Sequence, residues 1–276
     1  MTALLPAEAE RLAEVAARVR SRVVETVYAV GGGHVGGSLS AADLLTVLYF
    51  HRLKVNPADP SWPDRDRFIL SKGHCSLAHY AVLAERGFFP VDELRTYGSL
   101  GSRLQAHPDM RKAPGIDMSS GSLGQGLSAG IGMALAARLK RLGYHTFVML
   151  GDGESQEGQV WEAAMWAGAH RLRSLTAIVD YNKLSQTGST EGLLPRESLA
   201  ARWRDFGWEV REISGHDLQA IALALASPGE IRPVLVLAHT VKGQGVSFMA
   251  GRSEFHSATL TREQAEAALA ELGVSR

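Results

Sequence analysis

The stretch that most constrains the fold runs from Gly151 to Gly188 (GDGESQEGQVWEAAMWAGAHRLRSLTAIVDYNKLSQTG). It opens directly after an apolar run rich in β-branched and aromatic residues, His145–Leu150 (HTFVML), and it contains a second such run, Leu175–Asp180 (LTAIVD). The amphipathic segment Gly158–Arg171 separates the two runs. Two strands joined by one helix of this length predict a right-handed βαβ unit with parallel strands.

Polar residues follow both predicted strands at the point where each strand ends. Gly151-Asp152-Gly153 follows the first strand and Asn182 follows the second. The carboxyl ends of neighbouring parallel strands lie at one edge of the sheet, where open α/β sheets bind ligands. A carboxylate from Asp152, a carboxamide oxygen from Asn182 and a backbone carbonyl near Leu184 are hard oxygen donors that suit Mg²⁺.

The glycine after the aspartate and the local charge both agree with a metal-bound diphosphate. Gly153 has no side chain, so a diphosphate could approach its backbone closely. No cluster of Lys or Arg accompanies the motif, which favours neutralisation of the phosphates by a metal ion. A Gly-Asp-Gly triplet alone is more typical of a plain turn between a strand and a helix. The hypothesis of a metal-bound diphosphate therefore rests on the triplet together with Asn182, which follows the next predicted strand.

Composition favours one α/β domain over residues 1–276, a mainly parallel sheet with helices on both faces. The chain has 276 residues, of which 45% are hydrophobic and 21% charged, enough for a sizeable core. Lys and Arg (29) balance Asp and Glu (29), so we expect no nucleic acid and no membrane as partner. The single Cys75 and the lack of a long apolar run or leader lead us to expect a cytoplasmic protein.

Further elements are predicted from hydrophobic periodicity and from capping and turn residues. Ser40 is predicted to be the N-cap of a helix over Ala41–Arg52. The other expected helices are Pro6–Val30, Ser76–Arg86, Val91–Tyr97, Leu123–Arg141, Ser198–Phe206, Asp217–Ala226 and Thr261–Leu272, and the other expected strands are Phe68–Leu70, Trp208–Ile213 and Pro233–Ala238.

Four of the ten histidines lie in segments rich in Gly, Ser or Pro that are predicted at the same sheet edge: His34, His74, His107 and His256. Any one of them alone is more typical of a structural residue. Four at one edge indicate a cluster in a single cleft. Neutral imidazoles donate hydrogen bonds to a diphosphate or a sugar hydroxyl, and they transfer protons near neutral pH.

Taken together, these motifs resemble the amino-terminal domain of transketolases over nearly the whole chain. The words that carry the resemblance are GGGHVGGSLSAADLL, DRFILSKGHCSLAHY, QAHPD, GIDMSSGSLGQG, the Gly151–Gly188 stretch and HTVKGQGVSFM followed by His256. The resemblance implies a thiamine-diphosphate-binding fold and the cofactors thiamine diphosphate and Mg²⁺, with Ca²⁺ or Mn²⁺ able to replace the metal. It implies transfer of a two-carbon ketol unit from a ketose phosphate to an aldose phosphate, as in the pentose phosphate pathway.

The resemblance also assigns roles to individual residues. The metal ligands would be Asp152, Asn182 and the Leu184 carbonyl. Cofactor contacts would come from His74, Gly153, Glu154, Asn182 and His256, and from Gly121, Ser122 and Leu123 against the aminopyrimidine. The catalytic residues would be His34, His107 and His256 at the sugar and the reacting carbon, and Glu157, which would couple paired active sites.

Two departures from the family pattern matter. The family words GHPG, GPLGQG and QGHPE appear here as GHVG, GSLGQG and QAHPD; the first two words keep their glycines, and the histidines of GHPG and QGHPE are kept. A full transketolase is more than twice as long, and its next domain carries the rest of the active site. We therefore expect the partner to be a separate carboxy-terminal transketolase subunit, in an α2β2 heterotetramer with the cofactor at the interface.

Three alternatives remain open at this stage. The first is half of another thiamine-diphosphate enzyme, such as a deoxyxylulose-phosphate synthase, a 2-oxoacid dehydrogenase or a transketolase for a specialised sugar. SKGH and SSGSLGQG favour a transketolase over the first two. The second is a non-catalytic regulatory subunit, against which the retained Asp152, Asn182 and histidines argue. The third is a nucleotide-binding protein, but no GxxxxGK[ST] loop is present.

Overall fold

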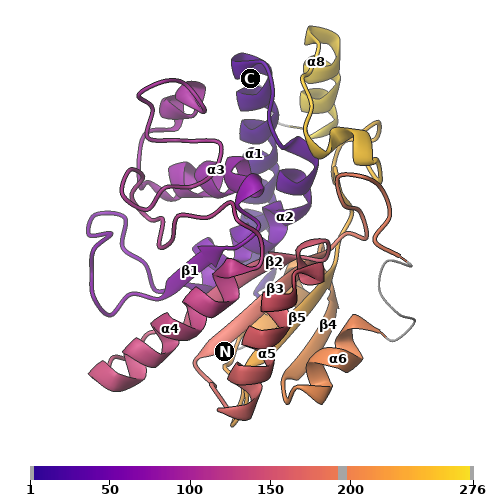
Figure 1. The fold of residues 1–276 in the computed structure, drawn as a ribbon. Helices are drawn as coiled ribbons and strands as arrows, with labels where there is room; N and C mark the ends of the chain where they lie inside the picture. Colours follow the sequence, from indigo (N-terminus) through magenta and orange to yellow (C-terminus); the bar gives the residue numbers. More distant parts are fainter. Residues whose placement is uncertain (1–2, 192–197, 274–276) are drawn as a thin grey trace.

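The computed structural model describes residues 3–191 and 198–273. Its strands pair in parallel in the order β1-β2-β3-β5-β4 (Figure 1). Parallel pairing of β2 and β3 across an intervening helix confirms the βαβ unit that the sequence predicted. The strands are β1 (Arg67–Leu70), β2 (Thr146–Gly151), β3 (Leu175–Tyr181), β4 (Glu209–Ser214) and β5 (Val234–His239).

Helices cover both faces of this sheet, as expected for an α/β fold (Figure 1). Most predicted helix bounds agree with the observed ones to within a few residues. The α-helices are α1 (Pro6–Val30), α2 (Val35–Val47), α3 (Ser76–Arg86), α4 (Gln125–Lys140), α5 (Gly158–Ala169), α6 (Leu199–Asp205), α7 (Leu218–Leu225) and α8 (Arg262–Glu271). Shorter turns of other helix types are η1 (Leu48–Arg52), η2 (Gly73–Cys75), η3 (Val91–Thr96), η4 (Glu154–Gln156) and η5 (Ser253–His256).

Strands β2, β3 and β5 are buried on both faces, which explains why their sequences are mostly apolar rather than alternating, whereas the edge strand β4 is partly exposed and carries charged residues. In β3, Ile178 packs into the core formed with α1, α2 and α3. Its neighbours Ala177 and Val179 pack into the opposite core, with α4, α5 and α6. Each face of the sheet therefore has its own hydrophobic core, and the polar strand ends are left at the rim.

The start of α2 differs from the prediction. The expected helix began at Ala41 with Ser40 as N-cap, but α2 begins at Val35 and Ser40 lies fully buried inside it. A Cβ atom at Gly36 would lie 2.7 Å from the carbonyl oxygen of Phe255, so this turn of helix requires glycine for packing. Glycine has low helix propensity, and tertiary packing overrode that preference here. His34 thereby becomes the N-cap of α2.

Strand register brings the polar strand ends side by side. Gly151 in β2 pairs with Asp180 in β3, and Asp180 pairs with Ala238 in β5. The residues that follow, Asp152 and Asn182 among them, therefore leave the sheet at the same edge. Within residues 3–191 and 198–273, no helix is both long and apolar enough to cross a membrane.

Candidate active site

A cavity of about 380 Å³ opens at the carboxyl ends of β2, β3 and β5. It brings together most of the site residues that the sequence predicted: His34, His74, His107, Gly121, Leu123, Asp152, Gly153, Glu154, Asn182, Leu184 and His256. Two predicted residues lie outside the lining. Ser122 is exposed in the loop that precedes α4, and Glu157 is exposed at the N-cap of α5. Their predicted roles stay predictions.

The proposed oxygen ligands face this cavity and are held by the protein. Asp152 is 6% exposed, and its carboxylate accepts a hydrogen bond from the Thr190 hydroxyl at 2.8 Å. Burial raises the pKa of Asp152, although Thr190 partly offsets this. The Asn182 carboxamide oxygen accepts from the backbone N–H of Leu184 at 3.1 Å, while its nitrogen faces Asp180 at 3.4 Å. The amide oxygen is thus fixed by its neighbours.

The donor set fits a hard divalent cation. One carboxylate, one amide oxygen and one carbonyl leave the remaining positions of an octahedron for phosphate and water, which is how Mg²⁺ is usually bound. No cluster of three or more His, Cys, Asp or Glu side chains suited to a metal occurs among the described residues. The site would therefore depend on the mixed oxygen donors of Asp152, Asn182 and Leu184.

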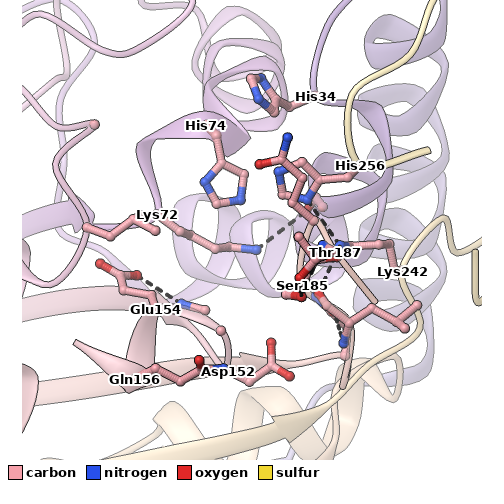
Figure 2. A pocket seen from close by; sticks show the side chains of 18 of the residues that line it. His34, Lys72, His74, Asp152, Glu154, Gln156, Ser185, Thr187, Lys242 and His256 are labelled. Atoms are coloured by element: carbon pink, nitrogen blue, oxygen red, sulfur yellow. Dashed lines mark hydrogen bonds between the residues drawn. The ribbon is translucent and has the colours of Figure 1, made fainter. Parts of the chain in front are cut away.

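The four histidine rings form a contiguous cluster on the other side of the cavity. Figure 2 shows the rings of His34, His74 and His256 facing the carboxylate of Asp152 across the opening. The ring centre of His34 lies 5.5 Å from that of His74, 6.0 Å from that of His107 and 5.4 Å from that of His256. The residues come from four segments that are far apart in the sequence, so this cluster exists only in the folded chain.

Burial and like charge keep these imidazoles neutral. Burial lowers the pKa of His34 to about 4, helped by His74 and His107, and burial with Lys72 lowers that of His74 to about 4. Burial and the Lys242 ammonium lower the pKa of His256 to about 3. Each neutral ring has one N–H donor and one acceptor nitrogen, so it can hold a hydroxyl or accept its proton.

Glu154 ties the loops of the site together. It is 3% exposed, and one carboxylate oxygen accepts from the Ser71 hydroxyl and from the backbone N–H of Gly124 at 2.8 Å. The other oxygen accepts from the backbone N–H of Gly151 at 3.0 Å. Both oxygens thus bind protein groups at the ends of β1 and β2 and before α4. Its predicted contact with the cofactor remains a prediction.

Two lysines that were not predicted as site residues from the sequence also line the cavity. The expectation that no basic cluster accompanies the metal motif was wrong for the folded chain, because Lys72 and Lys242 arrive from distant segments. Lys72 is bonded to the buried carboxylate of Asp180. The Lys242 ammonium donates to the carbonyl of Leu184 at 2.8 Å. The only signal in the sequence was a lysine beside glycine in two of the quoted loop words, SKGH and VKGQG.

Comparison with known proteins shows the family to which the chain belongs. A family model described as the thiamine diphosphate binding domain of transketolase matches residues 12–276. The chain is 47% identical to the 6-deoxy-6-sulfo-D-fructose transketolase subunit of Clostridium sp. (strain MSTE9), covering 92% of this chain and 93% of that subunit. It is 43% identical to one of the subunits of the apulose-4-phosphate transketolase of Phocaeicola vulgatus, covering 92% of this chain and 90% of that one.

The solved structures give the same result. The crystal structure of transketolase from Campylobacter jejuni superposes with a TM-score of 0.90 at 32% identity, over 96% of this chain and 43% of that one. The chain therefore spans nearly all of the two subunits but less than half of that single-chain enzyme. From the family match and these identities, the chain belongs to the transketolase family, in which it corresponds to the thiamine diphosphate binding domain.

Proposed function

We propose that this chain is the diphosphate-binding subunit of a two-chain transketolase that moves a two-carbon ketol unit from a ketose to an aldose. One observation carries the proposal: the oxygen donors of Asp152, Asn182 and Leu184 and the four clustered histidines line the same cavity. A structural or regulatory role would not require both a set of hard oxygen donors and a set of neutral imidazoles in one opening.

Mg²⁺ would be held by the Asp152 carboxylate, the Asn182 amide oxygen and the Leu184 carbonyl. The diphosphate would contact His74, the Gly153 backbone and Asn182. The Lys242 ammonium, directed into the cavity beside Leu184, adds a positive charge close to these groups. When bound, thiamine diphosphate would supply the carbon nucleophile on which the two-carbon unit is carried.

The protein side chains would position the sugar and move its protons. His34, His107 and His256 are neutral near physiological pH because burial lowers their pKa values. They would hold the sugar hydroxyls and accept the proton of the hydroxyl beside the carbon–carbon bond that breaks. The Gly121–Leu123 backbone, with Ser122 in it, would lie against the aminopyrimidine ring, Glu154 would support the cofactor and Glu157 would face the second active site.

A carboxy-terminal subunit would complete this site. The relatives that the chain matches over nearly their full length are named as subunits, and the single-chain enzyme has a further stretch of more than half its length. We propose an α2β2 heterotetramer with the cofactor between unlike chains. To test this, the chain would be co-expressed with a second chain that matches the remaining part of the single-chain enzyme. Native mass spectrometry should then give the mass of two copies of each chain.

The donor is proposed to be a ketose with a strong acid at its far end. The two relatives are named for 6-deoxy-6-sulfo-D-fructose and for apulose 4-phosphate, which share this feature. A pentose phosphate is the second candidate. A panel of 6-deoxy-6-sulfofructose, apulose 4-phosphate, fructose 6-phosphate and xylulose 5-phosphate, assayed with the two-chain complex, would rank them by kcat/KM.

Calorimetry tests the metal and cofactor site. Asp152→Asn should strongly weaken Mg²⁺-dependent binding of thiamine diphosphate, because the only charged ligand of the three is replaced by a neutral amide of the same shape. Asp92→Asn is the control, since Asp92 is exposed and lines a separate cavity between α1, η3 and α8. Equal cofactor affinity in the two variants would refute the site assignment.

A further inference from the structure

His216 lies outside the cavity, in the turn between β4 and α7, and links two parts of the fold. Its Nδ1 atom lies 2.7 Å from a carboxylate oxygen of Asp43 in α2. Its Nε2 atom lies 2.8 Å from the backbone nitrogen of Val241. Val241 immediately precedes Lys242, whose ammonium reaches into the cavity.

The backbone donor fixes the tautomer of His216. A backbone N–H can only donate, so Nε2 must present its lone pair to Val241. In the neutral ring the proton then lies on Nδ1, where it is donated to Asp43. Arg20 holds that carboxylate from the other side through both of its terminal nitrogens. The ring is therefore clamped between a buried ion pair and the loop that follows β5.

The loop that His216 holds is the one that carries Lys242. The backbone N–H of Gly243 donates to the carbonyl of Gly36 at 2.9 Å, and the Lys242 carbonyl accepts from Gly251 at 2.8 Å. At the point where the loop leaves β5, the Thr240 hydroxyl donates to Asp180, and His216 adds a second side-chain contact one residue later, at Val241. The Lys242 ammonium lies 2.8 Å from the Leu184 carbonyl and 3.2 Å from Nδ1 of His256.

We propose that His216 is a positioning residue for cofactor binding: its Nε2 atom anchors the Val241 amide and so fixes the Lys242 ammonium beside the Leu184 and Ser185 carbonyls, where it adds positive charge to the cavity. This rests on the proposed function of that cavity. His216 touches neither cofactor nor substrate. It acts through the peptide between Val241 and Lys242, so its effect should fall on affinity for thiamine diphosphate.

Two conservative variants separate the two ends of the ring. His216→Gln places an amide group near the position of Nε2, where its oxygen can accept from Val241, but it loses the donor to Asp43. His216→Asn places an amide group near the position of Nδ1, where its nitrogen can donate to Asp43, but it loses the acceptor for Val241. Each variant keeps one of the two hydrogen bonds.

The proposal predicts that the two variants rank in opposite order for cofactor affinity and for stability. His216→Asn should weaken thiamine diphosphate binding by the two-chain complex about 10-fold or more, whereas His216→Gln should stay within about 3-fold of the unaltered chain, on the basis that one lost hydrogen bond costs roughly a factor of ten. Urea denaturation should give the opposite order, with His216→Gln the less stable variant, because it leaves the buried Asp43 without this donor. A purely structural role would make affinity follow stability.

Two measurements on the full 276-residue chain need no cofactor. The ¹⁵N resonances of His216 should show the proton on Nδ1. Amide hydrogen exchange at Val241 should accelerate at least 10-fold in His216→Asn and stay slow in His216→Gln. Unchanged protection of Val241 in His216→Asn, or a weaker-binding His216→Gln, would overturn the inference. Failure of the unaltered complex to bind thiamine diphosphate would instead count against the proposed function.

Discussion

The ammonium of Lys72 is bonded to the carboxylate of Asp180 at the floor of the cavity, and the two side chains are only 2% and 0% exposed. The Ser40 hydroxyl donates to the same carboxylate at 2.6 Å, and the Thr240 hydroxyl also donates to it. Burial alone would lower the pKa of Lys72, but Asp180 more than offsets this and raises it. Both groups therefore remain charged, and Asp180 in turn faces the amide nitrogen of Asn182.

Lys72→Met should destabilise the chain by about 3–5 kcal/mol, because it leaves the Asp180 carboxylate buried without its counter-charge. Urea denaturation measures the loss. Lys183→Met is the matched control, since Lys183 forms an ion pair with Glu191 in which the side chains are 48% and 62% exposed. Such exposed pairs contribute about 0–1 kcal/mol. Similar losses in the two variants would show that the buried pair is not important for stability.

His107→Asn should lower the turnover of the two-chain complex, whereas His74→Asn should weaken its binding of the cofactor. His107 is the exposed member of the histidine cluster and is proposed to act on the sugar, so its loss should lower kcat about 100-fold or more with little change in cofactor affinity. His74 is proposed to contact the diphosphate, so its loss should raise the Kd for thiamine diphosphate.

The control for both histidine variants is His170→Asn. His170 stacks on Trp166 at the end of α5, is exposed, and is not among the residues lining the cavity. Its replacement should leave kcat and cofactor affinity unchanged. The role assignment fails if His107→Asn weakens cofactor binding while His74→Asn leaves it intact.

Acid should destabilise the fold through buried neutral histidines. Burial lowers the pKa of His79, which contacts the Tyr49 hydroxyl at 2.7 Å, from 6.5 to about 3. Between these values the unfolded chain takes up a proton that the folded chain does not, so the stability that is fully present above pH 6.5 is lost as pH falls towards 3. The slope is about 1.4 kcal/mol per pH unit for each such proton.

His79→Gln should therefore reduce the dependence of the unfolding free energy on pH between about 6 and 4, whatever it does to stability at neutral pH. Denaturant titrations at several pH values measure this slope. His145, whose pKa burial also lowers to about 3, offers a second site, and His145→Gln should reduce the slope by a similar amount. An unchanged slope in both variants would contradict the prediction.

Gly168→Ala should strongly destabilise the chain, by about 3 kcal/mol or more, because a Cβ atom there would lie 1.7 Å from the carbonyl oxygen of Phe206. Thermal unfolding measures the effect. Gly132 in α4 is the matched control, because a Cβ atom added there would meet nothing within 4 Å. Gly132→Ala should instead stabilise the helix by about 0.5–1 kcal/mol. If Gly168→Ala left the thermal stability unchanged, α5 would not pack this closely against the loop that contains Phe206.

The strands and the polar residues at their ends were predictable because the signals are local. Burial on both faces makes β2, β3 and β5 mostly apolar. The residue directly after each of these strands is polar: Asp152 after β2, Asn182 after β3 and Thr240 after β5. The start of α2 was mispredicted because its glycines have low helix propensity. Their close approach to Phe255 and Cys75 is a contact between distant segments, which local sequence does not encode.

The sequence by itself determined the fold class, the family and the types of residue available for chemistry, because periodicity, strand-end motifs and word order are properties of the chain. Only the tertiary structure decided which of these residues meet. Lys72 is 108 residues from Asp180 in the chain, and Lys242 is 58 residues from Leu184, yet each pair is in hydrogen-bond contact. Such contacts depend on sheet register and helix packing, and these are set by the whole core rather than by neighbouring residues.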